Sequence, residues 1–411
     1  MRKRFFLMAL VVILQVCGFW GGQVAPAAAF TEEQQLVNEA WRIVNRAYLD
    51  ETFNHQNWSA VRQKLLKQPL ENREKAYQTI QKMLGSLDEP FTRFLTPEQY
   101  RSLQVSTSGE LMGVGLQIVV DAATGELEVV TPIAGSPAEL AGIKPRDRIL
   151  EIDGISTTTL TLDEAAARMR GQAGTKVTLK VKRPTTETQE IPLVRGRISL
   201  NPVSSKLNQL PGSPPIGYIR LSQFSANATL EVTRAIQKLQ QQGAVAYVLD
   251  LRNNPGGLLQ AGIEIARLWL DRGTIVYTVN RQGVMGSFDA NGTALTAAPL
   301  AVLVNQGTAS ASEILAGALQ DNRRAELVGE KTFGKGLIQS LFDLPDGAGL
   351  AVTVAKYETP NHRDIHKLGI SPNRTVNLDS ITLEQIGTPA DPQYQAAVEL
   401  LQKQTMVAGA A

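Results

Sequence analysis

The sequence predicts an α/β multidomain protein in three consecutive parts, and three patterns along the chain support this. Residues 30–104 carry apolar side chains at helical spacing, such as Leu36 and Ile43, and show no catalytic motif, which predicts a helical packing module. Residues 105–195 contain short β-like runs separated by turn residues. Residues 196–411 alternate strand-like and helix-like segments, which predicts a mixed sheet covered by helices, with a helical C-terminal tail. A chain of 411 residues is long enough for two or three domains.

A targeting segment at residues 1–29 precedes these parts. Basic residues 2–4 lead into an apolar run at residues 5–20, and small residues follow up to Ala29. This order is typical of a cleaved signal peptide, and the run is shorter than the roughly 20 residues that a membrane-spanning helix needs. We therefore expect cleavage near Ala29 and a soluble protein in an exported compartment. An uncleaved membrane anchor is the alternative.

The composition of the mature chain excludes several functional classes. Cleavage removes three basic and no acidic residues, which leaves 38 basic and 39 acidic residues, so the charge does not indicate a nucleic-acid partner. The single cysteine, Cys17, is removed as well, which excludes a disulfide, a thiolate metal site and a cysteine nucleophile. Besides His55, the only histidines are His362 and His366, whose spacing suits a metal only on a helix, whereas Pro360 predicts a turn. We expect no metal and no cofactor.

The segment GTASASEI at residues 307–314 places a serine at the start of an apolar, helix-like run. Ser310 could simply cap that helix. It would also lie where backbone N–H groups and the helix dipole stabilise a developing oxyanion. Ser312 is the rival nucleophile, about 200° around the helix if both residues are helical.

A lysine is the candidate base, because no histidine lies in this stretch. Lys335 follows Ser310 by 25 positions, in FGKGL, and burial there would keep its amine neutral near pH 7. A surface lysine in a turn is the alternative interpretation. Lys331 has polar neighbours and is the weaker candidate. Gln339 would share a strand face with Lys335 and could orient it.

Two glycine turns could present backbone N–H groups to a ligand. NNPGG at residues 253–257 lies between a strand and a helix, and it could complete an oxyanion hole opposite the Ser310 loop or form only a tight turn. GVGL at residues 113–116 leads into a strand and could bind a carboxylate, although a simple turn would also explain it.

Residues 105–190 resemble a PDZ domain, the module that captures peptide C-termini. The resemblance rests on GVGL and on AGSPAELAGIKPRDRILEIDG at residues 134–154. It implies that an extended peptide adds as a strand, with its terminal carboxylate on the loop amides. The residues expected to bind it are Gly113, Val114, Gly115 and Leu116.

The order of the signal segment, the PDZ-like module, DLRNNPGG, GTASASEI and GEKTFGKG resembles that of a carboxyl-terminal processing protease. The resemblance implies a serine endopeptidase with a crotonase-like ββα core, in which Ser310 is the nucleophile and Lys335 the general base. The further residues to which it assigns roles are Gln339 or Asp321 beside the dyad, Gly256 and Ala311 in the oxyanion hole, and Arg170 in sensing bound peptide.

Residues 39–58, EAWRIVNRAYLDETFNHQNW, resemble the photosynthetic branch of that family. This implies that the partner is the C-terminal tail of a membrane-embedded photosystem II reaction-centre precursor. The enzyme itself would be soluble and would act in a thylakoid lumen or a periplasm. Three alternatives stay open: a general degradative protease of the same family, a catalytically inactive PDZ adaptor, and an acyl-CoA enzyme on the same core.

Overall fold

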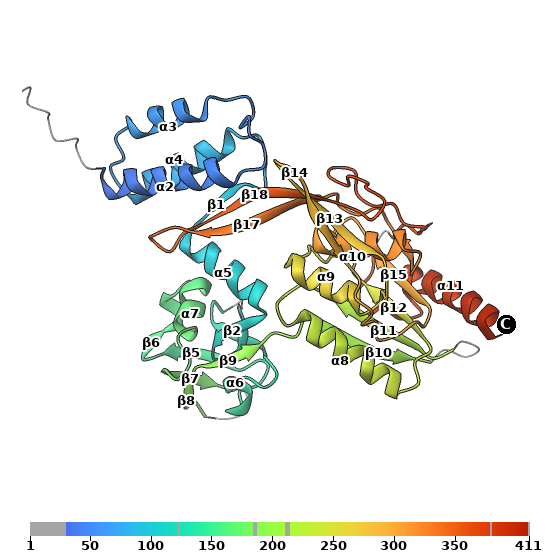
Figure 1. The fold of residues 1–411 in the computed structure, drawn as a ribbon. Helices are drawn as coiled ribbons and strands as arrows, with labels where there is room; N and C mark the ends of the chain where they lie inside the picture. Colours follow the sequence, from blue (N-terminus) through green and yellow to red (C-terminus); the bar gives the residue numbers. More distant parts are fainter. Residues whose placement is uncertain (1–29, 122–123, 184–186, 210–213, 379, 410–411) are drawn as a thin grey trace, which may run out of the picture.

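The computed structural model shows three parts joined along the chain (Figure 1). We call residues 30–104 the helical part, residues 105–195 the PDZ-like part and residues 196–411 the α/β core. The predicted signal segment, with Cys17 and Ala29, lies outside the described residues. The structure describes residues 30–121, 124–183, 187–209, 214–378 and 380–409.

The helical part contains the expected helices and one strand that the sequence analysis missed. Thr31 caps the first helix in a capping box with Gln34. The extended segment Arg93–Leu95 forms β1 and pairs antiparallel with β18 (Gly349–Glu358) of the α/β core, so the prediction of a wholly helical region is wrong there. Pairing with a distant strand overrides local propensity. The helices are α2 (Glu32–Ala47), α3 (Trp58–Leu66), α4 (Arg73–Gly85) and α5 (Pro97–Ser108).

The PDZ-like part has its own sheet, in the order β3-β4-β5-β7-β8, with β6 paired to β5. Its core is formed by fully buried side chains such as Val129, Ile149 and Leu179. A separate two-stranded ribbon joins it to the rest of the molecule and consists of β2 (Glu110–Gly113) and β9 (Gly196–Ser199). Its other elements are β3 (Leu116–Val120), β4 (Leu127–Pro132), α6 (Pro137–Leu140), β5 (Arg148–Ile152), β6 (Ile155–Ser156), η1 (Thr157–Thr159), α7 (Leu162–Met169), β7 (Lys176–Lys182) and β8 (Gln189–Val194).

A mixed six-stranded sheet forms the centre of the α/β core, in the order β10-β11-β12-β15-β16-β19. Only the β10–β11 pair is antiparallel among these neighbours. Helices α8, α9 and α10 pack on one face and α11 on the other (Figure 1). The elements are β10 (Val203–Asn208), β11 (Ile216–Leu221), α8 (Ala228–Gln241), β12 (Ala246–Asp250), α9 (Leu259–Arg267), β15 (Leu300–Val304), α10 (Ala311–Asp321), β16 (Glu326–Gly329), β19 (Arg374–Thr375) and α11 (Pro392–Gly409).

A second sheet connects the α/β core to the helical part. Its order is β1-β18-β13-β14, and β17 pairs with β18 on the opposite side from the main path. The turn of the β17–β18 hairpin packs into the helical part, where Leu344, Ala348 and Leu350 share a buried cluster with α2 and α4. The remaining strands are β13 (Thr274–Asn280), β14 (Gly283–Asp289) and β17 (Leu337–Asp343).

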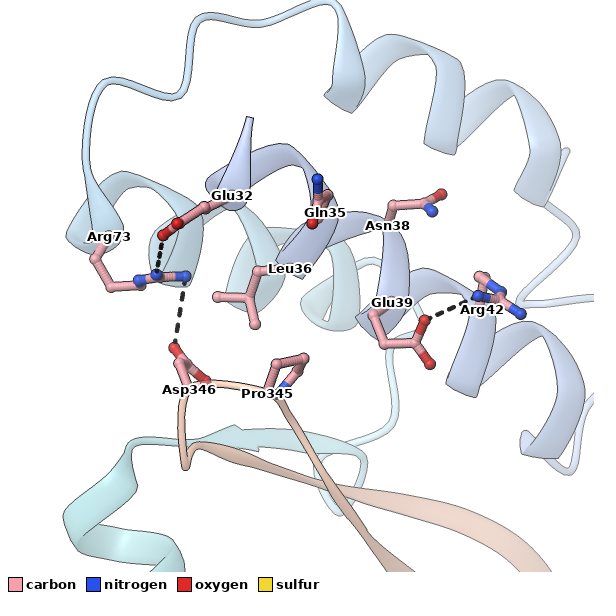
Figure 2. Close-up of a pocket in the computed structure, with 9 residues that line it drawn as sticks. All are labelled: Glu32, Gln35, Leu36, Asn38, Glu39, Arg42, Arg73, Pro345 and Asp346. Carbon is pink, nitrogen blue, oxygen red and sulfur yellow. Dashed lines mark hydrogen bonds and ion pairs between the residues drawn. The ribbon is translucent and has the colours of Figure 1, made fainter. Parts of the chain in front are cut away.

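A cavity of about 570 Å³ lies where the helical part meets this hairpin (Figure 2). Arg73 spans it, with its guanidinium 3.4 Å from Glu32 and 3.8 Å from Asp346. None of the residues predicted for catalysis lines it. Across the described ranges, no helix combines the length and apolarity needed to cross a membrane.

Candidate active site

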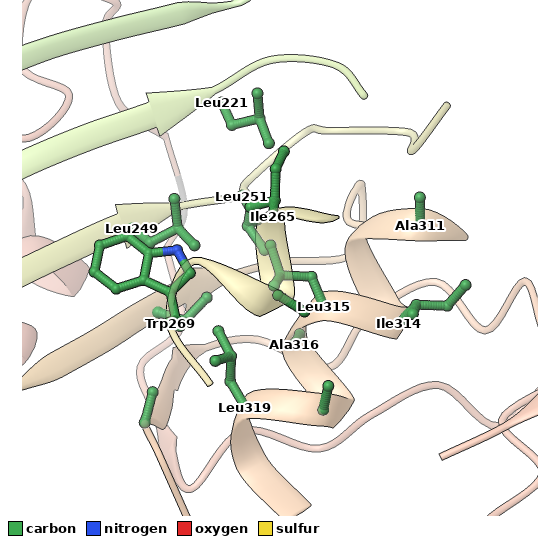
Figure 3. Packing of buried hydrophobic residues seen from close by; sticks show 14 of the residues in the cluster. Leu221, Leu249, Leu251, Ile265, Trp269, Ala311, Ile314, Leu315, Ala316 and Leu319 are labelled. Atoms are coloured by element: carbon green, nitrogen blue, oxygen red, sulfur yellow. The ribbon is translucent and has the colours of Figure 1, made fainter. Parts of the chain in front are cut away.

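Ser310 precedes α10 in a strained backbone conformation. Its φ of 57° and ψ of −118° are unusual for a residue with a side chain, and such strain concentrates at functional sites. The helix behind it is held rigidly, because Leu315 and Leu319 pack beside Trp269 in the main core (Figure 3). Ser310 itself is only partly buried. The fold therefore presents this hydroxyl on a fixed support.

Ser312 and Lys331, the alternative nucleophile and base, lie in environments that suit these roles less well. Ser312 is fully buried and its hydroxyl donates to the Asn254 carbonyl at 2.9 Å, so it serves the packing of the loops. Lys331 is exposed. Burial thus separates the two serines, which the sequence pattern left open.

Lys335 lies in the loop between β16 and β17 and is partly buried. Its Nζ atom is 4.9 Å from the centroid of the Phe91 ring. Burial, assisted by the positive charge of Arg93, lowers the pKa of the Lys335 amine below its ordinary value, while Glu89 and Glu313 act in the opposite direction. A lowered pKa increases the neutral fraction of an amine, which is the form that can accept a proton. No hydrogen bond joins it to the Ser310 hydroxyl in the described part of the chain, and in free enzymes such a contact often tightens only with substrate.

Glu313 connects the loops of Ser310 and Lys335, and the sequence analysis missed it. Its carboxylate is fully buried and accepts the backbone N–H groups of Ser310 at 2.9 Å and Lys335 at 2.8 Å. It also accepts from Gly334 N at 2.7 Å and from the Thr332 hydroxyl at 2.6 Å. The signal was present in the sequence, since a Ser-x-x-Glu pattern at a helix start predicts a side chain that reaches back to the cap.

Tyr357 holds the same two loops from their carbonyl side. Its hydroxyl lies 3.0 Å from the Ser310 carbonyl oxygen and 2.7 Å from that of Lys335. The side chain is fully buried; burial, followed by the charges of Glu313 and Asp364, raises the pKa of Tyr357 well above its ordinary value. The hydroxyl therefore stays protonated and acts as a donor. No sequence motif marks this strand residue.

The turn at Gly256 lies directly against the start of α10. Its φ is 99°, and a Cβ atom there would come within 2.9 Å of the Ala311 nitrogen, so only glycine permits this approach. The Gly256 N–H donates to the Asn254 side-chain oxygen at 2.9 Å in this structure. The Ala311 N–H belongs to the first turn of α10, where amides have no acceptor within the helix. The structure brings both predicted amides to the serine, with that of Gly256 engaged elsewhere.

A buried ion network fixes the strand end from which this turn begins. Arg252 is 5% exposed and pairs with Asp250 at 2.6 Å and with Asp391 at 2.7 Å, both fully buried. Tyr218 donates to Asp250 as well. Through Asp391 the network ties the start of α11 to the active-site turn.

Among the described residues, no hydrogen bond joins the side chain of Gln339 or Asp321 to Ser310 or Lys335. Gln339 lies on β17 and donates to the Thr353 hydroxyl at 3.2 Å. Asp321 ends α10, where it accepts from the Arg363 guanidinium and from the Asn361 N–H. Eleven positions along a helix separate Asp321 from Ser310 by roughly 16 Å, because each residue rises about 1.5 Å. These contacts give Asp321 the role of a helix-end anchor.

The histidine pair predicted to lie on a turn does so, outside any helix. His362 stacks on Tyr277 at 4.1 Å and bonds to Glu358, while the His366 ring lies near Phe91. Searching the described residues finds no group of three or more His, Cys, Asp or Glu arranged to bind a metal.

A second candidate site lies in the PDZ-like part, where a cavity of about 130 Å³ opens beside β3 and α7. The structure gathers all five residues predicted to bind or sense peptide around it. Gly115, with a φ of 81°, could not carry a Cβ atom without overlapping the Ser136 side chain. The predicted residues lining the cavity are Gly113, Val114, Gly115, Leu116 and Arg170.

Two family models match parts of this chain. Residues 215–376 match Peptidase family S41, and residues 128–183 match the PDZ domain. The chain is 62% identical over 400 residues to a carboxyl-terminal-processing protease of Synechocystis sp., covering 97% of this chain and 93% of that one. It is 50% identical over 359 residues to the chloroplastic carboxyl-terminal-processing peptidase 2 of Arabidopsis thaliana, covering 85% and 70%.

A solved structure, the photosystem II D1 C-terminal processing protease, is similar to the whole fold. Its TM-score is 0.57 at 41% sequence identity, and the match covers 89% of this chain and 100% of that one. The predicted fold class, with a PDZ domain and an S41 core, is confirmed. The chain belongs to peptidase family S41, among the carboxyl-terminal-processing proteases, and is a serine peptidase.

Proposed function

We propose that this serine peptidase cleaves the C-terminal extension from a membrane-embedded protein, the D1 precursor of photosystem II, with Ser310 and Lys335 as its dyad. The observation that carries the dyad is the Glu313 carboxylate, which binds the backbone of both residues and so holds nucleophile and base in one frame. The substrate follows from the relatives, because the chain shares 41% identity with the D1 processing protease.

The reaction begins when neutral Lys335 accepts the Ser310 proton and the Oγ atom attacks the scissile carbonyl carbon. The Ala311 N–H stabilises the resulting oxyanion, and the Gly256 N–H joins it when it exchanges its bond to Asn254 for one to the substrate. The Lys335 ammonium then gives its proton to the leaving amine, which departs with the extension. Water, deprotonated by Lys335, hydrolyses the acyl-enzyme and frees Ser310.

The PDZ cavity captures the tail of the substrate. The terminal carboxylate binds the amides between Gly113 and Leu116, and the extended tail adds beside β3. Arg170 lies on the same cavity and forms an isolated bridge with Gly113, and both observations support a role in sensing the bound tail. This site selects the end of the chain, while the dyad cuts it.

The enzyme acts after export, in a thylakoid lumen or a periplasm, as a soluble protein released by cleavage near Ala29. The basic and apolar residues of the N-terminal segment support this location. A relative at 50% identity, the carboxyl-terminal-processing peptidase 2 of Arabidopsis thaliana, is chloroplastic, which also supports this location.

A peptide with the D1 C-terminal extension tests the function, with mass spectrometry of the products. We expect one cut by the wild type and no cut by Ser310→Ala or Lys335→Ala, whereas Ser312→Ala keeps activity because its hydroxyl only bonds to Asn254. Many fragments from folded proteins would favour the degradative alternative. Tail binding without any cleavage by the wild type would instead favour the PDZ adaptor and overturn the proposal.

A further inference from the structure

The helical part reaches the proposed catalytic lysine through residues 89–92, which lie between α4 and β1. Phe91 is partly buried there, with its ring centroid 4.9 Å from Lys335 Nζ. The edge of the same ring meets the His366 ring at a centroid distance of 6.3 Å. An aromatic face thus lies within cation–π distance of the proposed general base, although it comes from a segment about 240 positions away in the sequence.

We propose that Phe91 is a positioning residue for proteolysis, whose ring holds the Lys335 amine and stabilises the positive charge it gains from Ser310. This proposal rests on the proposed function of Ser310 and Lys335. The contact is a cation–π interaction, and it strengthens when the Lys335 amine gains a proton during the reaction.

The physical reason is a difference between two protonation states. A neutral amine gains little from the negative face of an aromatic ring, whereas an ammonium is attracted to it. The interaction therefore favours the state in which Lys335 has accepted the Ser310 proton, and only such differential binding accelerates the chemical step. The ring also excludes water, which contributes to the burial that lowers the pKa of the Lys335 amine.

The charged and titratable groups near Lys335 do not replace the Phe91 ring in stabilising its positive charge. Glu313 of α10 and Glu89 are nearby carboxylates, but both accept several N–H and O–H donors, and no ion pair to Lys335 exists among the described residues. Arg93 of β1 repels a positive charge. The His366 ring lies near the Phe91 ring, at a centroid distance of 6.3 Å, and Tyr357 donates to the Lys335 carbonyl. A contacting carboxylate would hold the lysine permanently charged, whereas a ring lets it return the proton.

The backbone of Phe91 is fixed by Glu89. This carboxylate accepts from Phe91 N at 2.6 Å, from Thr92 N at 3.0 Å and from the Thr92 hydroxyl at 2.7 Å. It also accepts from the Thr353 hydroxyl of β18 at 2.7 Å, the same hydroxyl that receives the Gln339 amide. The network attaches the ring to the strand beside the catalytic loop, and Gln339 is part of that support.

Kinetics of Phe91 variants on the extension peptide test the proposal. Phe91→Leu keeps an apolar side chain but removes the π face, and we expect kcat to fall about 10-fold, equivalent to about 1.4 kcal/mol, with KM unchanged. Phe91→Tyr and Phe91→Trp should restore kcat because both retain an aromatic face. Phe94→Leu is the matched control, since Phe94 is buried beside Tyr77 away from the lysine.

A second measurement does not depend on cleavage. The pH dependence of Lys335 acylation by acetic anhydride, followed by mass spectrometry, reports its pKa directly. We expect a shift to lower pH in Phe91→Leu, because the ammonium loses its partner, and to higher pH in Phe91→Ala, because water enters.

The outcomes separate the two proposals. A Phe91→Leu variant with wild-type kcat and acylation profile overturns the role of Phe91 even if the wild type cleaves the peptide. A wild type that cleaves nothing overturns the proposed function, and the acylation profiles then decide alone whether Phe91 controls the lysine. Loss of activity in Phe94→Leu to the same degree would show that Phe91 acts only through folding.

Discussion

The helical part and the PDZ-like part both flank the α/β core, but they are attached to it in different ways. The helical part supplies β1 to a core sheet and shares a buried cluster with the β17–β18 hairpin, including Leu350 and Val352. The PDZ-like part keeps its hydrophobic cluster to itself and is joined by the β2–β9 ribbon. The attachment of the helical part suits a fixed geometry. The attachment of the PDZ-like part suits movement, since domains without a large apolar interface move relative to each other by default.

This difference matches the chemistry that each part serves. A general base, the role proposed for Lys335, needs its surroundings held within about 0.5 Å, and the helical part supplies Phe91 and Arg93 near this lysine. Tail capture tolerates relative motion, because a flexible substrate spans the gap between the cavity and the serine. Substitutions in the helical part should therefore affect kcat and stability, and those in the PDZ-like part should affect KM.

The largest expected effect comes from breaking the attachment of the helical part. Glu89→Ala leaves the Thr353 and Thr92 donors without their charged acceptor, and we expect a loss of about 3 kcal/mol in the free energy of unfolding. Urea denaturation measures it, and Glu98→Ala on the exposed side of α5 is the control. Equal stability of both variants would mean that β1 pairing alone holds the two parts together.

The next effect is expected in the PDZ cavity. Gly115→Ala introduces a Cβ atom that overlaps Ser136 and closes the predicted carboxylate loop, so KM for a tailed peptide should rise about 10-fold with little change in kcat. Gly125→Ala is a matched control, because its φ of 69° imposes the same backbone strain with open space around it. A fall in kcat without a change in KM would contradict the division of labour.

A smaller effect concerns the free energy of unfolding, which the buried amine of Lys335 lowers. The folded-state pKa of Lys335 is lowered below 10.5, so the unfolded chain binds more protons between the two values and wild-type stability rises with pH across that window. Lys335→Met should therefore be more stable than the wild type at neutral pH, and the difference should shrink as pH approaches 10.5. The exposed Lys331 gives the control, Lys331→Met, for which thermal unfolding should show no such trend.

The smallest effect is expected from Arg93. Its positive charge lowers the pKa of Lys335, so Arg93→Gln should move the rising limb of the kcat/KM profile to higher pH. Salt should reduce the wild-type effect because Arg93 is exposed and its field is screened. Arg170→Gln, in the PDZ-like part, is the comparison. If its rising limb stays at the wild-type pH, the positive charge that acts on Lys335 comes from the helical part.

Local patterns in the sequence predicted the elements and the motif residues well. Apolar spacing predicted α2, and the Thr31 capping box is present. The SASE and FGKG motifs pointed to Ser310 and Lys335, and the structure places these two on loops joined by Glu313. Such signals are short-range, because a helix period, a cap or a glycine turn involves residues within a few positions of each other.

The tertiary structure decided which of these residues meet. Burial distinguishes Ser310 from Ser312, whose hydroxyl bonds to a buried carbonyl. Gln339 and Asp321 bond to residues distant in the sequence, Thr353 and Arg363. Nothing in the local pattern of residues 89–93 predicted that an extended segment within a helical region would place Phe91 on the base. The sequence alone determined the reactive groups and the turns that carry them. Their environment was set only by the fold, since dielectric surroundings and ring contacts arise from segments hundreds of positions apart.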